Sequence, residues 1–148
     1  MRTKIAILLL FATLSLSATA QRVATGERLP RIKVVRELLQ ESQLLYIGFV
    51  HSASEPCRQS TAQIRALLAG RADISSLYLT READDWCEMW LLQMATEGEN
   101  VETEASAIFQ KLDVDYAPFG VIIDHKRRVV WFGNPRVLNS NNLEQILR

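Results

Sequence analysis

The side chains best suited to chemistry in this sequence are two thiols. Cys57 and Cys87 are the only cysteines among 148 residues, and by count alone they can form one disulfide or keep separate fates. The two histidines, His51 and His125, have no paired acidic and nucleophilic motif, and the chain has no glycine-rich phosphate loop. Any catalysis is therefore to be sought at the thiols.

Metal and serine-hydrolase sites are not indicated. Ser54 lies three residues from His51, and no nucleophile-elbow sequence surrounds it. The residues with soft donor atoms show no recognisable ligand spacing, namely Cys87, Met89, Met94, His51 and His125. We expect no metal and no other cofactor, and we interpret Met89 and Met94 as core residues.

The N-terminus has the order of features of a secretory signal peptide. Arg2 and Lys4 precede an apolar run from Ile5 to Leu16, and Ala18-Thr19-Ala20 supplies a cleavage site. The run is shorter than the ~20 residues that span a bilayer. We predict a signal peptide over residues 1–20 and a secreted, periplasmic protein; the alternative is an uncleaved N-terminal anchor.

Composition excludes several classes of protein. The chain is 48% apolar and 23% charged, with 17 basic and 17 acidic residues, which is typical of a globular domain. Cleavage removes two basic residues and no acidic one, leaving 15 − 17 = −2 on 128 residues. We therefore expect one domain, no nucleic-acid partner, and membrane contact only through an uncleaved signal peptide.

The remaining chain alternates helical and strand patterns. Residues 21–29 are polar and predict a flexible lead-in to a domain over residues 30–148. Helices are predicted over 30–40, 55–69, from Asp84 or Asp85 to about 98, from Asn100 or Thr103 to about 112, and over 139–148; strands are predicted over 44–50, 74–80, 119–124 and 129–132. The fold class is α/β: a three-layer sandwich with about four strands in a mixed sheet, a C-terminal antiparallel hairpin, and helices on both faces.

Three further groups of side chains have structural interpretations. The glutamates at 97, 99, 102 and 104 are expected in a solvated loop and at a helix N-terminus. Trp86 and Trp90 are expected in the core, with an exposed recognition patch as the alternative. The residues Lys126-Arg127-Arg128 are expected in a solvated turn.

Two segments together resemble the thioredoxin superfamily, and most closely its secreted TlpA-type disulfide reductases. In that family a strand ends in an aromatic residue, and a loop leads to Trp-Cys-x-Pro-Cys followed by Arg or Lys. Phe49 matches the aromatic residue and Pro56-Cys57-Arg58 the second half of the motif. Ala53 stands at the Trp position and Ser54 at the first cysteine, which makes the site a degenerate Ser-x-x-Cys.

The second segment, residues 112–124, resembles the family's Val-x-x-x-Pro-x-x-x-x-Ile-Asp strand. The resemblance implies that Pro118 follows a cis peptide bond and faces the dithiol position. Residues 129–133 resemble the last strand, with Arg127 in place of the usual turn glycine. The resemblance covers residues 44–148.

Loss of the first cysteine determines what the resemblance implies for activity. In active members that cysteine attacks as a thiolate and the second resolves the mixed disulfide. A serine hydroxyl does not ionise near neutral pH, so the ordinary cycle is expected to be absent. Ser54 instead suits a helix N-cap before Glu55 and Pro56; the alternative is a contact between Ser54 and a ligand.

Three alternatives stay open for Cys57, which stands in the resolving position. It is a buried inert thiol, a partner of Cys87 in a disulfide, or a reactive thiol in a Cys57-Arg58-Gln59-Ser60 motif. Cys87 has acidic neighbours and a helix start beside it, which act on a thiolate in opposite directions. Its reactivity stays undecided.

The binding edge of the family survives loss of the nucleophile. The resemblance implies that backbone just before Pro118, at Tyr116 and Ala117, pairs with an extended segment of a peptide or protein partner. We therefore expect a non-catalytic or weakly active binding protein. The alternatives are an atypical thiol–disulfide oxidoreductase using Cys57 with Cys87 or with a partner's thiol, and a structural role in a larger envelope complex.

Overall fold

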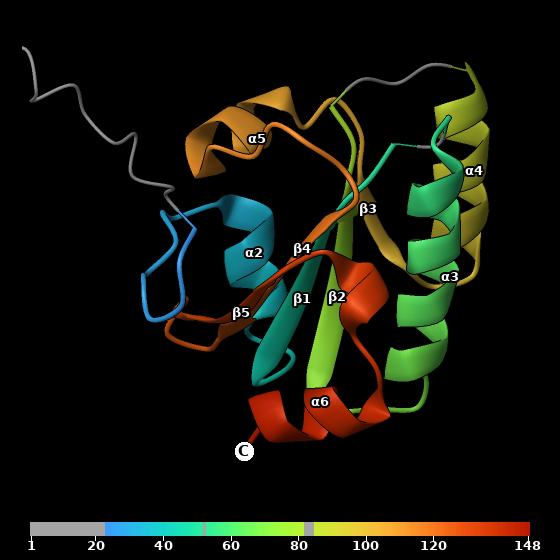
Figure 1. Ribbon diagram of the computed structural model, residues 1–148. Coiled ribbons are helices and arrows are strands. Elements are labelled where there is room, and N and C mark those ends of the chain that lie inside the picture. The colour runs from blue at the N-terminus through green and yellow to red at the C-terminus, as the bar shows by residue number, and fades with distance from the viewer. Residues whose placement is uncertain (1–22, 52, 82–84) are drawn as a thin grey trace, which may run out of the picture.

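The computed structural model describes residues 23–51, 53–81 and 85–148 (Figure 1). The predicted signal peptide therefore lies outside the described residues. The helices are α2 (Lys33–Leu38), α3 (Glu55–Leu68), α4 (Asp85–Thr96), α5 (Ser106–Leu112) and α6 (Ser140–Ile146), with a 3-10 turn over Pro135–Val137. The strands are β1 (Leu44–Phe49), β2 (Ile74–Leu79), β3 (Asn100–Glu102), β4 (Phe119–Asp124) and β5 (Val129–Gly133).

The strands form one mixed sheet in the order β3-β2-β1-β4-β5. β1 is parallel to β2 and antiparallel to β4, and β4 and β5 form the antiparallel hairpin. The α/β sandwich and its C-terminal hairpin are thus confirmed. The strand count is corrected from about four to five, because residues 100–102 form a short edge strand parallel to β2.

Alternation along β1 divides the core into two layers. Leu45, Ile47 and Phe49 point into one hydrophobic cluster, which α2 and α5 cover. Tyr46 points into the other cluster, which α3, α4 and α6 cover. Figure 1 shows these helices on opposite sides of the sheet. Because both of its faces are covered, β1 is apolar throughout rather than alternating with polar residues.

Two glycines let the buried Tyr46 ring lie close to the sheet. Gly48 and Gly120 are directly opposite each other on β1 and β4. A Cβ atom at Gly120 would stand 2.8 Å from Tyr46 Oη, and one at Gly48 would stand 3.0 Å from Tyr78 Cδ1. Any larger residue at Gly120 would therefore displace the tyrosine ring or the strand.

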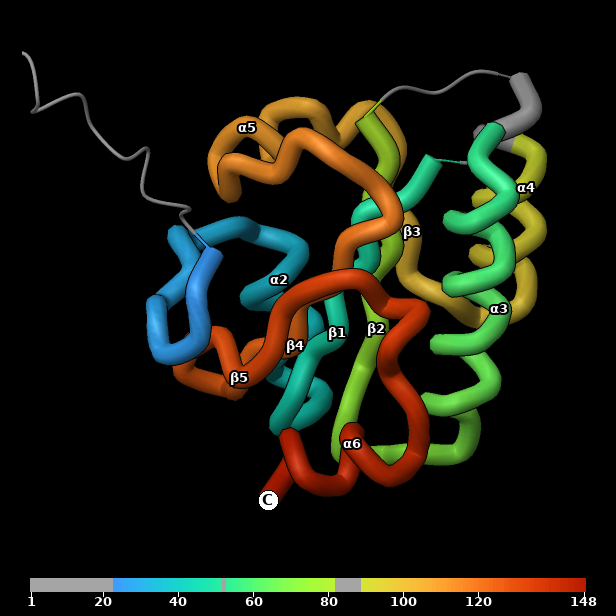
Figure 2. Tube along the Cα trace, in the orientation of Figure 1, coloured from blue at the N-terminus to red at the C-terminus, as the bar shows by residue number. Residues whose placement is uncertain are grey.

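The segment before residue 30 is part of the folded domain, although its sequence suggests a flexible lead-in. Val23 and Leu29 are buried in the cluster under α2, and Gly26 N–H donates to the carbonyl of Val129 at 2.8 Å. Figure 2 shows this blue segment beside β5. Two isolated apolar side chains carry no periodicity, so this packing is not visible in the sequence pattern.

Two predictions on α4 and α5 need correction. Met89 is 65% exposed rather than in the core, whereas Met94 is buried. Leu92 is also exposed, and among the described side chains of α4 (residues 89–96) Leu91 and Met94 are buried and Trp90 is half-buried. α5 begins at Ser106 and not at a cap from Asn100 or Thr103, because residues 100–102 belong to β3.

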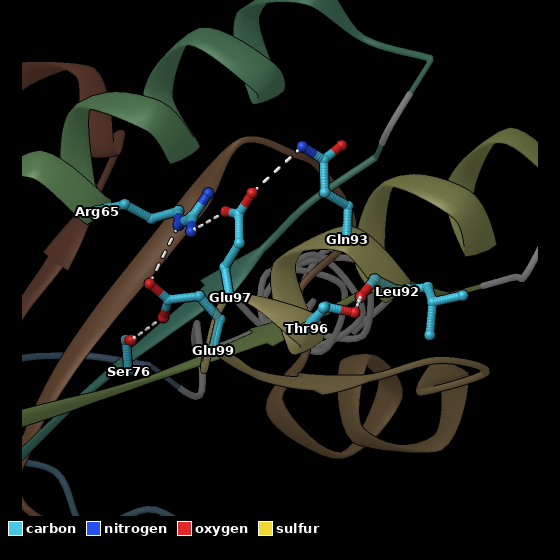
Figure 3. Close-up of polar contacts among 7 residues, drawn as sticks. All are labelled: Arg65, Ser76, Leu92, Gln93, Thr96, Glu97 and Glu99. Carbon is cyan, nitrogen blue, oxygen red and sulfur yellow. Dashed lines mark hydrogen bonds and ion pairs between the residues drawn. The ribbon is translucent and has the colours of Figure 1, made fainter.

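The glutamates after α4 are not simply solvated. Arg65 of α3 pairs with Glu97, and its Nε lies 3.0 Å from an oxygen of Glu99. The other Glu99 oxygen accepts a hydrogen bond of 2.9 Å from Ser76 of β2. Figure 3 shows these contacts joining α3, β2 and the segment before β3.

Candidate functional site

The site begins where β1 leaves the sheet and α3 starts. Ser54 has extended backbone angles, φ −92° and ψ 115°, and is the N-cap of α3. Its Oγ accepts a hydrogen bond from Cys57 N–H, with an N···O distance of 3.4 Å, and its carbonyl accepts one from Arg58 N–H at 3.1 Å. The Ser54 hydroxyl therefore serves the helix terminus as a hydrogen-bond acceptor.

The negative charge of Glu55 at the start of α3 is stabilised by two neighbouring side chains. The Glu55 carboxylate pairs with Arg58 and accepts a hydrogen bond of 3.2 Å from Gln59 Nε2. The hydrogen bond from Arg58 and its charge lower the pKa of Glu55. Glu55 is thus an anion in the first turn, where the helix dipole favours one. It supplies no proton near neutral pH.

Cys57 lies in the interior. It is a free thiol and none of its surface reaches solvent. Burial raises the pKa of the nearby Tyr46 phenol, and the Tyr78 and Cys57 side chains raise it further. A thiol in this position packs as a small apolar side chain and is shielded from a reagent in solution.

The segment before Pro118 reaches the same edge of the sheet. Phe49 at the end of β1 lies opposite Phe119 at the start of β4, so the loop after β1 and the segment 116–118 leave the sheet together. The Ala117–Pro118 peptide bond is cis. Tyr116 is 54% exposed, with its ring edge-on to Phe119 at a centroid distance of 5.2 Å.

The backbone of this segment is available for pairing. Within the described residues, neither Tyr116 N–H nor Ala117 N–H makes a hydrogen bond to another backbone group. Ala117 and Pro118 are half-buried, and β4 pairing begins only at Phe119. The segment therefore has the free donors that a strand-addition edge requires.

Arg81 is a positioning residue that the sequence pattern did not reveal. Its guanidinium lies over the Phe109 ring at 4.9 Å and donates to the Val114 carbonyl at 2.6 Å. It follows β2 and so ties that strand's end to the segment leading to Tyr116. No motif marks such a residue in the sequence, because its partners are a ring and a carbonyl more than 25 positions away.

Other predicted site residues are not gathered here. The β1–β4 register places Asp124 opposite Leu44, so His125 is at the far edge of the sheet from His51. In the part of the chain that is described, no three His, Cys, Asp or Glu side chains are placed to hold a metal ion. The side chains of Trp86 and Cys87 lie outside the described part, and Cys57 is a free thiol, so a disulfide between Cys57 and Cys87 is not shown.

Comparison with known proteins identifies the fold. No family model matches the chain, and no curated protein matches it. Among solved structures, the thioredoxin domain of a thiol-disulfide oxidoreductase from Bacteroides vulgatus is 11% identical, with 85% of this chain and 99% of that chain covered and a TM-score of 0.62. A thiol:disulfide interchange protein from a Bacteroides species is also 11% identical, with 84% and 90% covered and a TM-score of 0.64.

A peroxidoxin, BcpB from Mycobacterium tuberculosis, is similar at the same level, with 11% identity, 83% and 93% of the chains covered, and a TM-score of 0.62. The chain is thus an α/β protein of the thioredoxin-like class. It has the fold of the thiol-disulfide oxidoreductases, which confirms at the level of the fold the resemblance seen in its motifs. Among the described residues, no helix is both long and apolar enough to cross a membrane.

Proposed function

We propose that this protein is a secreted, periplasmic member of the thioredoxin superfamily that binds an extended peptide or protein segment and has lost ordinary dithiol exchange. The observation that supports it best is the role of Ser54, which stands where the family has its nucleophilic cysteine. Ser54 caps α3 while Cys57 beneath it is fully buried. Because Ser54 has a hydroxyl and Cys57 is not accessible, this site can neither attack a disulfide nor resolve a mixed disulfide.

Binding is proposed at residues 51–57, which comprise the end of the loop after β1 and the first turn of α3, together with Tyr116, Ala117 and Pro118. The free N–H groups of residues 116 and 117 support backbone pairing with an added strand, and the exposed Tyr116 ring offers apolar contact. Arg81 anchors the same segment through its hydrogen bond to the Val114 carbonyl. The partner's chemistry is therefore an unfolded or extended polypeptide rather than a small molecule.

The alternative is an atypical thiol–disulfide exchange by Cys57 with Cys87 or with a thiol of the partner. Its support is the fold itself, which solved thiol-disulfide oxidoreductases share. This route needs Cys57 to become reachable, because a disulfide bond forms only when a thiolate attacks sulfur directly.

An insulin-reduction assay separates the two functions. We expect no turnover above background for the wild type, and a gain of activity for Ser54→Cys, which restores the pair of thiols at the helix start. Cys57→Ser in the Ser54→Cys background is the matched control and should remove the gain. Turnover by the wild type that disappears in Cys57→Ser would replace the binding proposal by the exchange alternative.

Binding is tested with an array of short unstructured peptides. Peptides retained by the wild type should be lost by Tyr116→Glu, which places a charge beside the proposed edge, and kept by Val137→Glu, which changes an equally exposed side chain elsewhere. Equal retention by all three proteins would contradict binding at this edge.

A further inference from the structure

A concave site apart from the proposed binding edge lies beside the turn between β4 and β5. A pocket of about 350 Å³ is lined by α2, by the two residues before it and by the turn between β4 and β5. Four of its five lining residues are cationic: Arg31, Lys33, Arg36 and Arg127, with Ile32 as the apolar one. None of them belongs to the edge formed by residues 51–57 and residues 116–118.

The positive charge in this pocket is poorly neutralised. Within the described residues, Lys33 has the only ion pair of the four, to Glu37 at 3.9 Å, with both side chains largely exposed. Residues 1–22, which precede this part of the chain, contain no aspartate or glutamate. A concave surface lined by one sign of charge concentrates ligands of the opposite sign.

Arg127 gives this pocket a second feature. Its φ is +64°, in the left-handed region that favours glycine, so an arginine is the less favourable residue for the backbone. Its half-buried side chain donates to the Leu29 carbonyl and lines the pocket beside Arg36. Because the backbone at this position favours glycine, the presence of an arginine indicates a role for its side chain.

The chemistry of the lining selects the ligand. Guanidinium groups present several N–H donors in a plane and match the oxygens of a phosphate group, whereas a lysine adds a point charge. From the cavity, its four cations and the left-handed Arg127, we infer that this pocket binds a phosphate group, carried by a small molecule or by a lipid headgroup. Residues 126–128, which are predicted to form a solvated turn, then contribute Arg127 to a binding site.

Two probes distinguish the sources of the phosphate group. The purified protein is titrated at constant ionic strength with inorganic pyrophosphate, and separately mixed with vesicles of phosphatidylglycerol and phosphatidylcholine or of phosphatidylcholine alone. Binding of pyrophosphate identifies a small-molecule site, and binding only to the phosphatidylglycerol vesicles identifies a headgroup site. Either result supports the inference if the variants below behave as expected.

Arg36→Gln and Arg127→Gly should each weaken binding about tenfold, the usual effect of losing one charge-assisted hydrogen bond. Lys126→Gln is the matched control, because Lys126 is an exposed neighbour outside the pocket. Urea unfolding checks that Arg127→Gly is folded, since glycine adopts a φ of +64° without strain. Binding of neither probe, or an equal loss in Lys126→Gln, would overturn the inference.

Discussion

Ser54 has a structural role at the start of α3. Its Oγ accepts the N–H of Cys57 and so satisfies one of the unpaired donors at the start of α3. Ser54→Ala removes that acceptor and should lower the free energy of unfolding by about 1 kcal/mol. Ser54→Asp keeps an acceptor and adds a negative charge at the helix start, so we expect it to stay within a few tenths of the wild type.

Urea unfolding followed by circular dichroism measures both variants. A loss in Ser54→Asp as large as that in Ser54→Ala would show that capping does not explain the residue. In that case a contact between Ser54 and a ligand would become the better interpretation, and it would be tested by comparing peptide retention by the two variants.

At the scale of elements, Arg65 connects the last turn of α3 to the chain around β3. The network combines an ion pair to Glu97 with the Arg65–Glu99–Ser76 chain of contacts (Figure 3). Arg65→Gln should lower the melting temperature by about 2–4 °C, as expected for a partly exposed network in a domain of this size. Lys33→Gln is the control: it removes a pair at 3.9 Å between exposed side chains and should change little.

The effect of Arg65 should depend on pH. Hydrogen bonds from Arg65 and then from Gln93 lower the pKa of Glu97 in the folded protein. A carboxylate with a lowered pKa stabilises the fold above its ordinary pKa and stops doing so as the pH falls through the lowered value. The difference in melting temperature between wild type and Arg65→Gln should therefore shrink from pH 7 toward pH 3; a constant difference would contradict this origin.

Comparison of β3 with the longer elements shows which elements could be predicted from the sequence. β1, α3 and the β4–β5 hairpin have long apolar patterns or clear caps, and their predicted ranges agree with the structure within one or two residues. β3 has three residues and no pattern of its own. It exists because its backbone pairs with β2 and because Arg65 and Ser76 hold Glu99, and these partners are distant in the sequence.

The candidate site likewise contains residues that could be predicted from the sequence and one that could not. Ser54, Cys57 and Pro118 could be predicted because each belongs to a short local motif. Arg81 could not, because its role depends on where Phe109 and Val114 lie after folding. The burial of Cys57 was one of three alternatives, since a motif names the residue at a position but does not give its solvent exposure.

For the whole molecule, Cys57 is a probe of cooperative unfolding. It lies fully buried between α3 and the sheet, so a thiol reagent should reach it only when the domain opens. In Cys87→Ser, which leaves a single thiol, we expect labelling in native buffer at least ~10³-fold slower than in urea, as follows from an ordinary domain stability of about 5 kcal/mol or more.

The rate should then rise with urea along the global unfolding curve and fall in any variant that stabilises the domain. Ser54→Ala in the same background provides the check, because loss of the cap should speed labelling by about fivefold if it costs about 1 kcal/mol. Labelling of Cys57 at the rate of an unfolded thiol in native buffer would mean that the first turn of α3 opens on its own. Cys57 would then be reachable for thiol exchange, as the alternative function requires.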